Sequence, residues 1–158
     1  MGQGDISMKT IGTIVKDSHR DIYTVSADDT VHSAVLYMTS RNIGAVTVVD
    51  GNRVVGLFSE RDLMKRVVAE GRDPVSVQVR EVMTTELTIA SPDESYEEGL
   101  RKMQQARCRH LPILENNSFV GLISLRDLLK VDADEKAEEI RMLNTYINYM
   151  PPSLAKGN

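Results

Sequence analysis

The sequence contains little of what builds secreted, metal-binding or membrane proteins. Its 158 residues include one cysteine, Cys108, which excludes an internal disulfide framework and a zinc site built from cysteines. No apolar run approaches the roughly 18 residues of a membrane-spanning helix. Residues 1–9 are polar and lack the apolar stretch of a signal peptide. We therefore expect a soluble cytoplasmic protein.

Aromatic residues and net positive charge are also scarce. With no tryptophan, 2 phenylalanines and 5 tyrosines, the core has to be aliphatic. The formal net charge is −4, which gives no electrostatic support for binding nucleic acid or an anionic membrane. We expect neither as a partner. The contents of 41% hydrophobic and 27% charged residues are those of an ordinary globular protein.

What the chain does contain is an internal repeat. The segment Val54–Leu63 returns as Phe119–Leu128, and the offset of 65 residues holds without a gap over positions 22–65 of the first copy. A fixed-period repeat indicates architecture, but two copies are too few for a solenoid, which needs about three or more units. We therefore expect a pseudo-symmetric pair of packed units.

Each copy shows the same order of expected elements. A short extended piece leads into a helix that starts at Thr30 or Ser95, both good N-cap residues. Two apolar strands joined by a tight turn follow, and then a second helix. The order β-α-β-β-α predicts an α+β fold with two tandem motifs. The extended pieces are expected at 22–26 and 87–90, and the strands at 45–49, 54–58, 111–114 and 119–123.

These elements divide the chain into six expected segments. Gly71 and Pro74 break the last helix of the first copy. A helix after the second copy carries a narrow apolar stripe without a counterpart in the first, so it packs on the body or on another subunit. The segments are a mobile tail at 1–10, motif 1 at 11–70, a linker at 71–85, motif 2 at 86–131, a C-terminal helix at 132–150 and a tail at 151–158.

The strongest local signal is Gly-hydrophobic-hydrophobic-Ser-x-Arg-Asp, which occurs in both copies. Glycine lets a strand approach another group closely, because it has no Cβ. Serine stands at the strand–helix junction and aspartate one turn later, so a hydroxyl and a carboxylate face one spot. Such a carboxylate can accept both hydroxyls of a ribose, and amides at the helix start can bind a phosphate oxygen. These residues are Gly56, Ser59, Arg61 and Asp62 in the first copy and Gly121, Ser124, Arg126 and Asp127 in the second.

The same motif also has a purely structural interpretation. Ser-x-x-Asp at the start of a helix is an N-capping arrangement, in which the helix dipole favours the acidic side chain. Capping alone accounts for one isolated copy. The recurrence of the same glycine and arginine in both copies favours a ligand site, and the two interpretations are compatible.

The tandem motif and the order of elements resemble a CBS domain pair, also called a Bateman module. The resemblance covers about 8–131 and includes the turns into the first helices and the strand containing Arg109-His110-Leu111-Pro112. The C-terminal helix is similar to the tail of small stand-alone CBS-pair proteins. The family implies a pseudo-two-fold pair with two clefts that commonly bind AMP, ADP, ATP, S-adenosylmethionine or NAD.

The resemblance also implies roles for individual residues. The aspartates would hold ribose hydroxyls, and the serines would lie near ribose and phosphate. Thr24 becomes Ile89 and Gly44 becomes Arg109 in the second copy, so the two clefts are not expected to be equivalent. The first adenine pocket would be formed by Ile22, Thr24, Gly44 and Ala45, and Arg109 and His110 beside Pro112 would reach phosphate in the second copy.

Two side chains keep alternative interpretations. His110 is a phosphate contact or a packed strand residue, and Cys108 is by default a small buried hydrophobe. We expect no enzyme, because no nucleophile–base–orienter set and no metal-ligand spacing are visible.

The sequence as a whole predicts a regulatory sensor. The expected ligand is AMP first, followed by NAD(H), ATP and S-adenosylmethionine. The protein would act through ligand-dependent association with an unidentified protein effector, as a homodimer through helical faces. The alternative is a structural or oligomerisation module whose clefts bind no ligand.

Overall fold

The computed structural model describes residues 9–18 and 21–148, so residues 1–8 of the tail expected at 1–10, and the whole tail expected at 151–158, lie outside this range. Lys9 and Thr10, which were expected in the mobile tail, are ordered. Thr10 caps α1 (Ile11–Asp17) through its side chain and forms an antiparallel bridge with Ser95. This short helix was not predicted, because seven residues give too little hydrophobic periodicity.

The first unit follows the predicted order. Strand β1 (Thr24–Ser26) pairs in parallel with β2 (Ala45–Asp50), which pairs antiparallel with β3 (Arg53–Ser59). Between β1 and β2 lies α2 (Val31–Arg41), whose N-cap is Thr30 as expected. After β3 the chain continues as one short turn of helix, α3 (Glu60–Asp62), and the π-helical segment η1 (Leu63–Val68).

The second unit repeats this plan with a smaller sheet. Its elements are α5 (Tyr96–Ala106), β4 (His110–Glu115), β5 (Ser118–Ser124) and α6 (Leu125–Asn148). Asn116 and Asn117 both have positive φ, as a two-residue hairpin of the I′ type requires. The extended piece expected at 87–90 contributes only a parallel bridge between Ala90 and Ile113, so this sheet has two strands.

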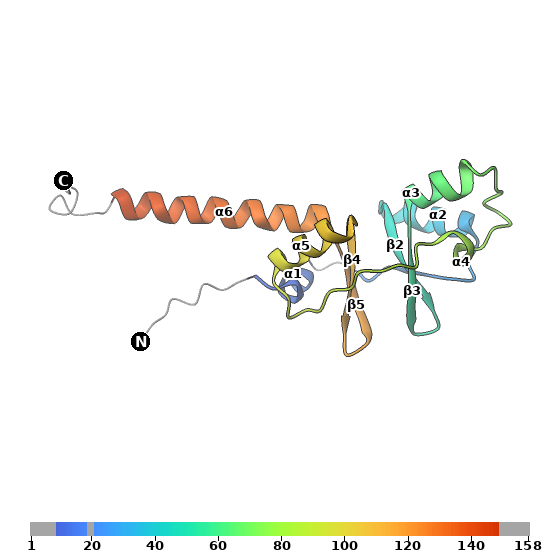
Figure 1. The fold of residues 1–158 in the computed structure, drawn as a ribbon, viewed down its shortest axis with the longest axis horizontal. Helices are drawn as coiled ribbons and strands as arrows, with labels where there is room; N and C mark the ends of the chain where they lie inside the picture. Colours follow the sequence, from blue (N-terminus) through green and yellow to red (C-terminus); the bar gives the residue numbers. More distant parts are fainter. Residues whose placement is uncertain (1–8, 19–20, 149–158) are drawn as a thin grey trace.

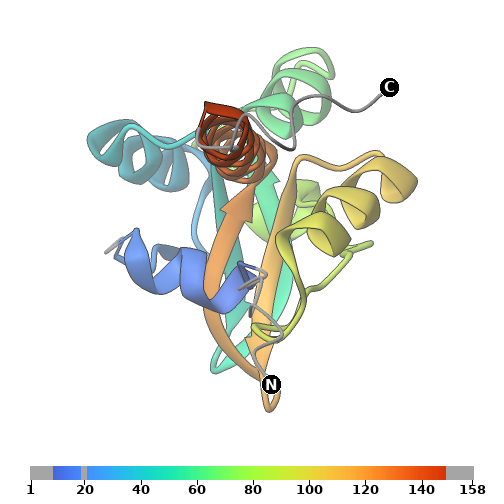
Figure 2. The ribbon, with the colours of Figure 1, turned by 90° about the vertical axis from the view of Figure 1, so that its left-hand side faces the viewer.

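The two units exchange the segments that precede them (Figures 1 and 2). Helix α1 packs on the second unit, where Ile11 N donates to Glu94 O and Gly12 N to Pro92 O, both at 2.9 Å. The short helix α4 (Val79–Val82) packs on the first unit, where Val79 N donates to Asp29 O at 2.8 Å. The segment that precedes each unit in the sequence therefore packs on the other unit.

The exchanged segments also enter the two cores. Val79 and Val82 are buried in the first core with Phe58, and Ile11 is buried in the second core with Leu128. As predicted, the motif glycines allow close approach. A Cβ on Gly56 would lie 2.6 Å from Met83 Sδ, and one on Gly121 would lie 3.1 Å from Val15 Cγ1. What the glycines approach is the exchanged segment.

Helix α6 is continuous from Leu125 to Asn148, so the second helix of motif 2 and the expected C-terminal helix at 132–150 are one element. Neither glycine nor proline interrupts this stretch. Tyr96 Oη donates to Asp132 Oδ1 at 3.2 Å and ties the first half of α6 to α5. Residues 133–148 are exposed, and the helix extends away from both units in Figure 1. Packing on the body of its own chain is therefore excluded for this part of α6.

No helix among residues 9–18 and 21–148 combines the length and the apolar character that a membrane crossing needs.

Candidate functional site

The strand–helix junction of the first copy forms a complete capping box. Asp62 N donates to Ser59 Oγ at 3.3 Å, and Asp62 Oδ2 accepts from Ser59 N at 3.0 Å and from Ser59 Oγ at 3.1 Å. The reciprocal bonds form because β3 ends at Ser59 in extended backbone and the helix begins at the next residue. The capping interpretation of the motif is thus correct, and it fixes the carboxylate in space.

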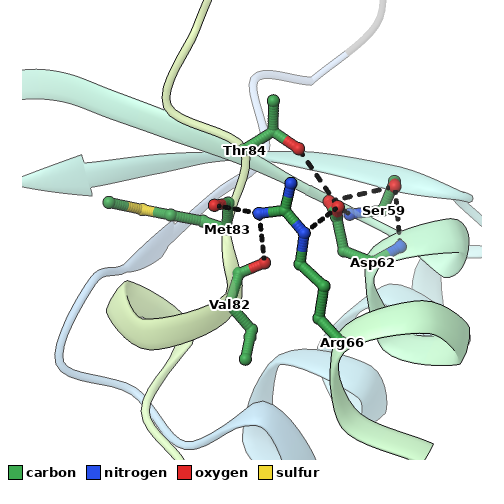
Figure 3. A network of polar contacts seen from close by, with 6 residues as sticks. All are labelled: Ser59, Asp62, Arg66, Val82, Met83 and Thr84. Atoms are coloured by element: carbon green, nitrogen blue, oxygen red, sulfur yellow. Dashed lines mark hydrogen bonds and ion pairs between the residues drawn. The ribbon is translucent and has the colours of Figure 1, made fainter. Parts of the chain in front are cut away.

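Two further residues hold the same carboxylate (Figure 3). Thr84 Oγ1 donates to Asp62 Oδ1 at 3.1 Å, and Arg66 Nε lies 3.7 Å from that oxygen. Asp62 is only 7% exposed. A nearly buried carboxylate needs such partners, because an uncompensated charge is strongly disfavoured away from water.

Asp62 lies on a cleft of about 280 Å³. One wall comes from the first copy, through Ala45, Ser59 and α3, and continues into Thr84. A second wall comes from the second copy, through residues 86–88 and the loop between α5 and β4. The lining residues are Gly44, Ala45, Leu57, Ser59, Glu60, Arg61, Asp62, Thr84, Glu86, Leu87, Thr88, Arg107, Cys108, Arg109 and His110.

The second-copy wall concentrates cationic and titratable side chains. Arg107 is the C-cap of α5 in the left-handed region, with φ of 54°, and Arg109 and His110 follow within three residues. Burial lowers the pKa of His110 below its ordinary value of 6.5, although Asp127 acts in the opposite direction. The neutral imidazole can donate or accept a hydrogen bond, whereas the guanidinium groups supply positive charge.

Gly44 lines the cleft and lies close to the side chain of Glu60. A Cβ there would lie 3.2 Å from the carboxylate of Glu60, whose backbone N donates to Gly44 O at 3.0 Å. The second copy makes the same backbone bond from Leu125 N to Arg109 O at 2.7 Å. The two junctions share this backbone bond, but Gly44 and Glu60 of the first copy are replaced by Arg109 and Leu125 in the second.

The second junction repeats the capping bonds. Ser124 N donates to Asp127 Oδ2 at 2.9 Å, and Asp127 N donates to Ser124 Oγ at 3.1 Å. These residues lie at the start of α6, and they do not line the cleft that contains Asp62. The two motifs are thus alike as caps and unlike in surroundings.

The structure brings seven of the predicted site residues together and separates the rest. Arg109 and His110, expected in a second-copy cleft, line the cleft of Asp62, because the pseudo-two-fold packing sets the second copy against the first. Ile22 and Thr24, expected in the first adenine pocket, do not line it, and Ile22 is 55% exposed. The seven are Gly44, Ala45, Ser59, Arg61, Asp62, Arg109 and His110, whereas Pro112, Ser124, Arg126 and Asp127 lie elsewhere.

Several lining residues were not predicted. Leu87 and Thr88 are the second-copy equivalents of Ile22 and Tyr23. They line the cleft of Asp62, whereas Ile22 and Tyr23 do not. The repeat could have predicted this. When two copies pack about a pseudo-two-fold axis, the extended segment that leads into one copy can lie at the strand–helix junction of the other. The other unpredicted lining residues are Leu57, Glu60, Thr84, Glu86, Arg107 and Cys108.

A second, more open hollow of about 480 Å³ lies between α5 and α6. It is lined mainly by apolar side chains and shares Arg107, Cys108 and Arg109 with the cleft. Over the part of the chain that the structure describes, no group of three or more His, Cys, Asp or Glu residues could hold a metal ion.

The sequence profile of the CBS domain matches the chain twice, at residues 11–69 and 79–134. The chain belongs to the CBS domain family. It is a tandem CBS pair, and CBS pairs are in general regulatory rather than catalytic modules. Each match includes one junction motif together with the helix that precedes its unit and packs on the other one, α1 in the first match and α4 in the second.

Among related proteins are small CBS proteins from bacteria and plants. The CBS domain-containing protein YhcV of Bacillus subtilis is 38% identical over 115 residues, which is 72% of this chain and 81% of that protein. The mitochondrial CBS domain-containing protein CBSX3 of Arabidopsis thaliana is 32% identical over 127 residues. That match spans 77% of this chain and 62% of the plant protein.

Solved structures share the fold. A putative signal-transduction protein with CBS domains from Burkholderia ambifaria superposes with a TM-score of 0.74 at 39% identity, covering 78% of this chain and 93% of that one. The CBS pair of the protein MJ0100 superposes with a TM-score of 0.71 at 18% identity, covering 81% and 98%. It was solved in complex with 5′-methylthioadenosine and S-adenosyl-L-methionine.

Proposed function

We propose that this CBS pair is a regulatory module that binds an adenosyl nucleotide, AMP first, in the cleft of Asp62. The observation that carries the proposal is a nearly buried carboxylate, fixed by Ser59 and Thr84, that lines the same cleft as Arg107 and Arg109. A carboxylate accepts ribose hydroxyls, and arginines bind phosphate through planar, charged hydrogen-bond donors.

The charges of the cleft favour a phosphate-bearing ligand over S-adenosylmethionine. Of the charged lining residues, Glu60, Arg61 and Asp62 belong to the first copy, and Glu86, Arg107 and Arg109 belong to the second. A nucleotide placed with its ribose at Asp62 and its phosphate toward the arginines matches both signs. The two compounds in the MJ0100 complex contain an adenosyl group, which supports the ligand class for this fold.

We further propose that the output is an association between subunits through helical faces, with an unidentified protein as effector. Met64 and Leu129 occupy the same repeat position and are 59% and 50% exposed. At about 100° per residue, Leu129 lies on the same face of α6 as Ile140 and Ile147. An apolar face on both copies that continues along α6 is the surface that a homodimer requires.

The test is ligand binding to the full chain. We expect AMP to raise the melting temperature, because a ligand at about a hundredfold excess over Kd stabilises the folded state by about 2.7 kcal/mol. Calorimetric titration then ranks AMP, NADH, ATP and S-adenosylmethionine. Asp62→Ala should lose AMP binding at the first cleft, and Asp127→Ala serves as the matched variant at the other junction. The proposal fails if no adenosyl compound shifts the melting curve at millimolar concentration.

The ligand-free alternative has one observation in its favour, since capping accounts for the bonds between Ser59 and Asp62. Ser59→Ala separates the two readings of the motif. Loss of an N-cap lowers the free energy of unfolding by about 1 kcal/mol in either case. A structural module shows only this loss, whereas a binding module also loses affinity for AMP.

A further inference from the structure

Two features of the first copy have no equivalent in the second among the described residues, and both adjoin Asp62. One is Arg66, whose Nη1 donates to Met83 O at 2.8 Å and to Val82 O at 3.3 Å while Nε faces Asp62 (Figure 3). At the equivalent repeat position stands Val131, an apolar side chain that is 9% exposed.

The other feature is the π-helical segment η1 that contains Arg66. Its backbone bonds span five residues, from Ala69 N to Met64 O and from Arg72 N to Val67 O, both at 2.9 Å. The equivalent residues of the second copy belong to the regular helix α6. Single π turns are rare and occur often at functional sites. The first copy therefore departs from regular helix at the residue that contacts both Asp62 and the linker.

The bonds of Asp62 leave little room for a ligand without rearrangement. Its Oδ2 accepts from Ser59 twice, and its Oδ1 accepts from Thr84 and faces Arg66. A carboxylate has about four lone-pair sites, so a ribose diol can be accepted only when present donors turn away. The two hydroxyls can rotate. The guanidinium of Arg66 is fixed by the carbonyls of Val82 and Met83.

Those carbonyls belong to a rigid part of the linker. Val82 is fully buried in the first core, and Met83 packs against Gly56. Thr84 and Leu57 exchange two backbone bonds, at 2.8 and 2.9 Å. Residues 79–84 lead directly into the second copy. A change at Asp62 that alters its contact with Arg66 thus acts on the segment that joins the two motifs.

We propose that Arg66 is a positioning residue that couples Asp62 to the linker segment 79–84. It orients the carboxylate toward the ribose, and it transmits occupancy of the first cleft to the carbonyls of Val82 and Met83. The inference rests on the proposed nucleotide site. Because Val131 offers no donor at the equivalent position, a route through this position belongs to the first copy.

The coupling itself is tested in the free, full-length protein by hydrogen exchange of the 79–84 amides. We compare wild type, Asp62→Asn, Arg66→Met and the double variant. Asp62→Asn should raise the exchange rates in this segment about threefold or more when Arg66 is present. In the Arg66→Met background the same change should raise them by clearly less, because residues in contact have non-additive effects. The cycle is repeated with Thr84→Val, because the Thr84 hydroxyl is a second route from Asp62.

Two variants separate geometry from charge. Lys65→Met removes one positive charge from an exposed neighbour on the same segment and should leave the cycle unchanged. Arg66→Lys keeps the charge but lacks the planar fork, so most of the coupling should be lost. If the effects of Asp62→Asn and Arg66→Met are additive, the inference is overturned, whether or not a nucleotide binds.

Binding measurements then test the positioning role. AMP and adenosine present the same ribose, so Arg66→Met should weaken both by a similar factor, about tenfold. A loss confined to AMP would mean that Arg66 contacts phosphate directly and would overturn the assignment. At saturating AMP, exchange in 79–84 should change in wild type and stay constant in Arg66→Met. If wild type binds no adenosyl compound, the proposed function fails, while the cycle in the free protein still decides the coupling.

Discussion

At the scale of single residues, the cleft contains a histidine whose protonation is opposed by its surroundings. Burial lowers the pKa of His110, Arg109 acts in the same direction, and Asp127 acts against both. The folded protein therefore binds this proton less readily than the unfolded chain does. By linkage, the contribution of His110 to stability is present above its ordinary value of 6.5 and is lost as the pH falls below it toward the lowered value.

We expect His110→Gln to remove this part of the acid sensitivity. Wild type should lose more stability than the variant between pH 7.5 and pH 5, measured as the denaturant midpoint at each pH. His32→Gln is the control, because His32 is exposed on α2. Equal pH dependence in wild type, His110→Gln and His32→Gln would contradict the burial of a neutral imidazole at this position.

Residue-level prediction from the sequence succeeded where a short motif determines its own geometry. The bonds of Ser59 with Asp62, and of Ser124 with Asp127, follow from three-residue spacing at a helix start. The second-copy residues of the cleft could not be predicted in this way, because Arg107, Leu87 and Thr88 line the cleft of Asp62 only through tertiary packing. The way the two copies pack on each other determines which extended segment lies beside which strand–helix junction, and the sequence alone does not specify this packing.

At the scale of elements, α6 carries an apolar stripe that the other described residues of its own chain do not cover. Ile140 and Ile147 are 58% and 66% exposed on one face, in line with Leu129. A helix with an apolar stripe obtains most of its stability from packing on that stripe. An uncovered face of this length in a single subunit supports a second copy as its partner.

We expect the double variant Ile140→Glu and Ile147→Glu to reduce the molar mass from dimer to monomer in light scattering. The melting temperature of the two units should change little, because both side chains point away from their cores. Met142→Glu with Thr145→Glu places the same charges on the opposite face and should leave the mass unchanged. If both double variants have the mass of wild type, the stripe is not the interface.

Element boundaries were predictable where local chemistry marks them. Thr30 and Ser95 cap the two helices that the sequence assigned to them, and the asparagine pair forms the expected turn. Helix α1 was not predicted, since it is short and its apolar residues Ile11 and Ile14 have their partners in the second unit. The continuity of α6 was not predicted, because the repeat suggested a boundary after residue 131. No glycine or proline ends the helix there.

At the scale of the whole molecule, the exchanged segments make the two units interdependent. Ile11 lies before the first unit and is fully buried in the second core, whereas Val79 lies after the first unit and is fully buried in the first core. Neither unit can lose its packing without releasing a segment covalently linked to the other. We therefore expect the pair to unfold in one cooperative transition.

Ile11→Ala tests this expectation in a calorimeter. Truncating a fully buried isoleucine lowers the free energy of unfolding by about 2–5 kcal/mol, and the single transition should move to lower temperature as a whole. Ile22→Ala is the matched control at an exposed isoleucine and should shift it little. Two resolved transitions, only one of which moves in Ile11→Ala, would show that the units unfold independently.

The same exchange has a consequence for biosynthesis. As the chain leaves the ribosome, α1 appears before the first unit, but its binding surface on α5 and α6 is made only after that unit. The first unit can close once α4 has emerged, while Ile11 and Ile14 stay uncovered until nearly the whole pair has been translated. Domains generally fold as units during synthesis, and exposed apolar surface promotes aggregation. During translation there is therefore an interval in which α1 exposes an apolar surface that a chaperone can bind.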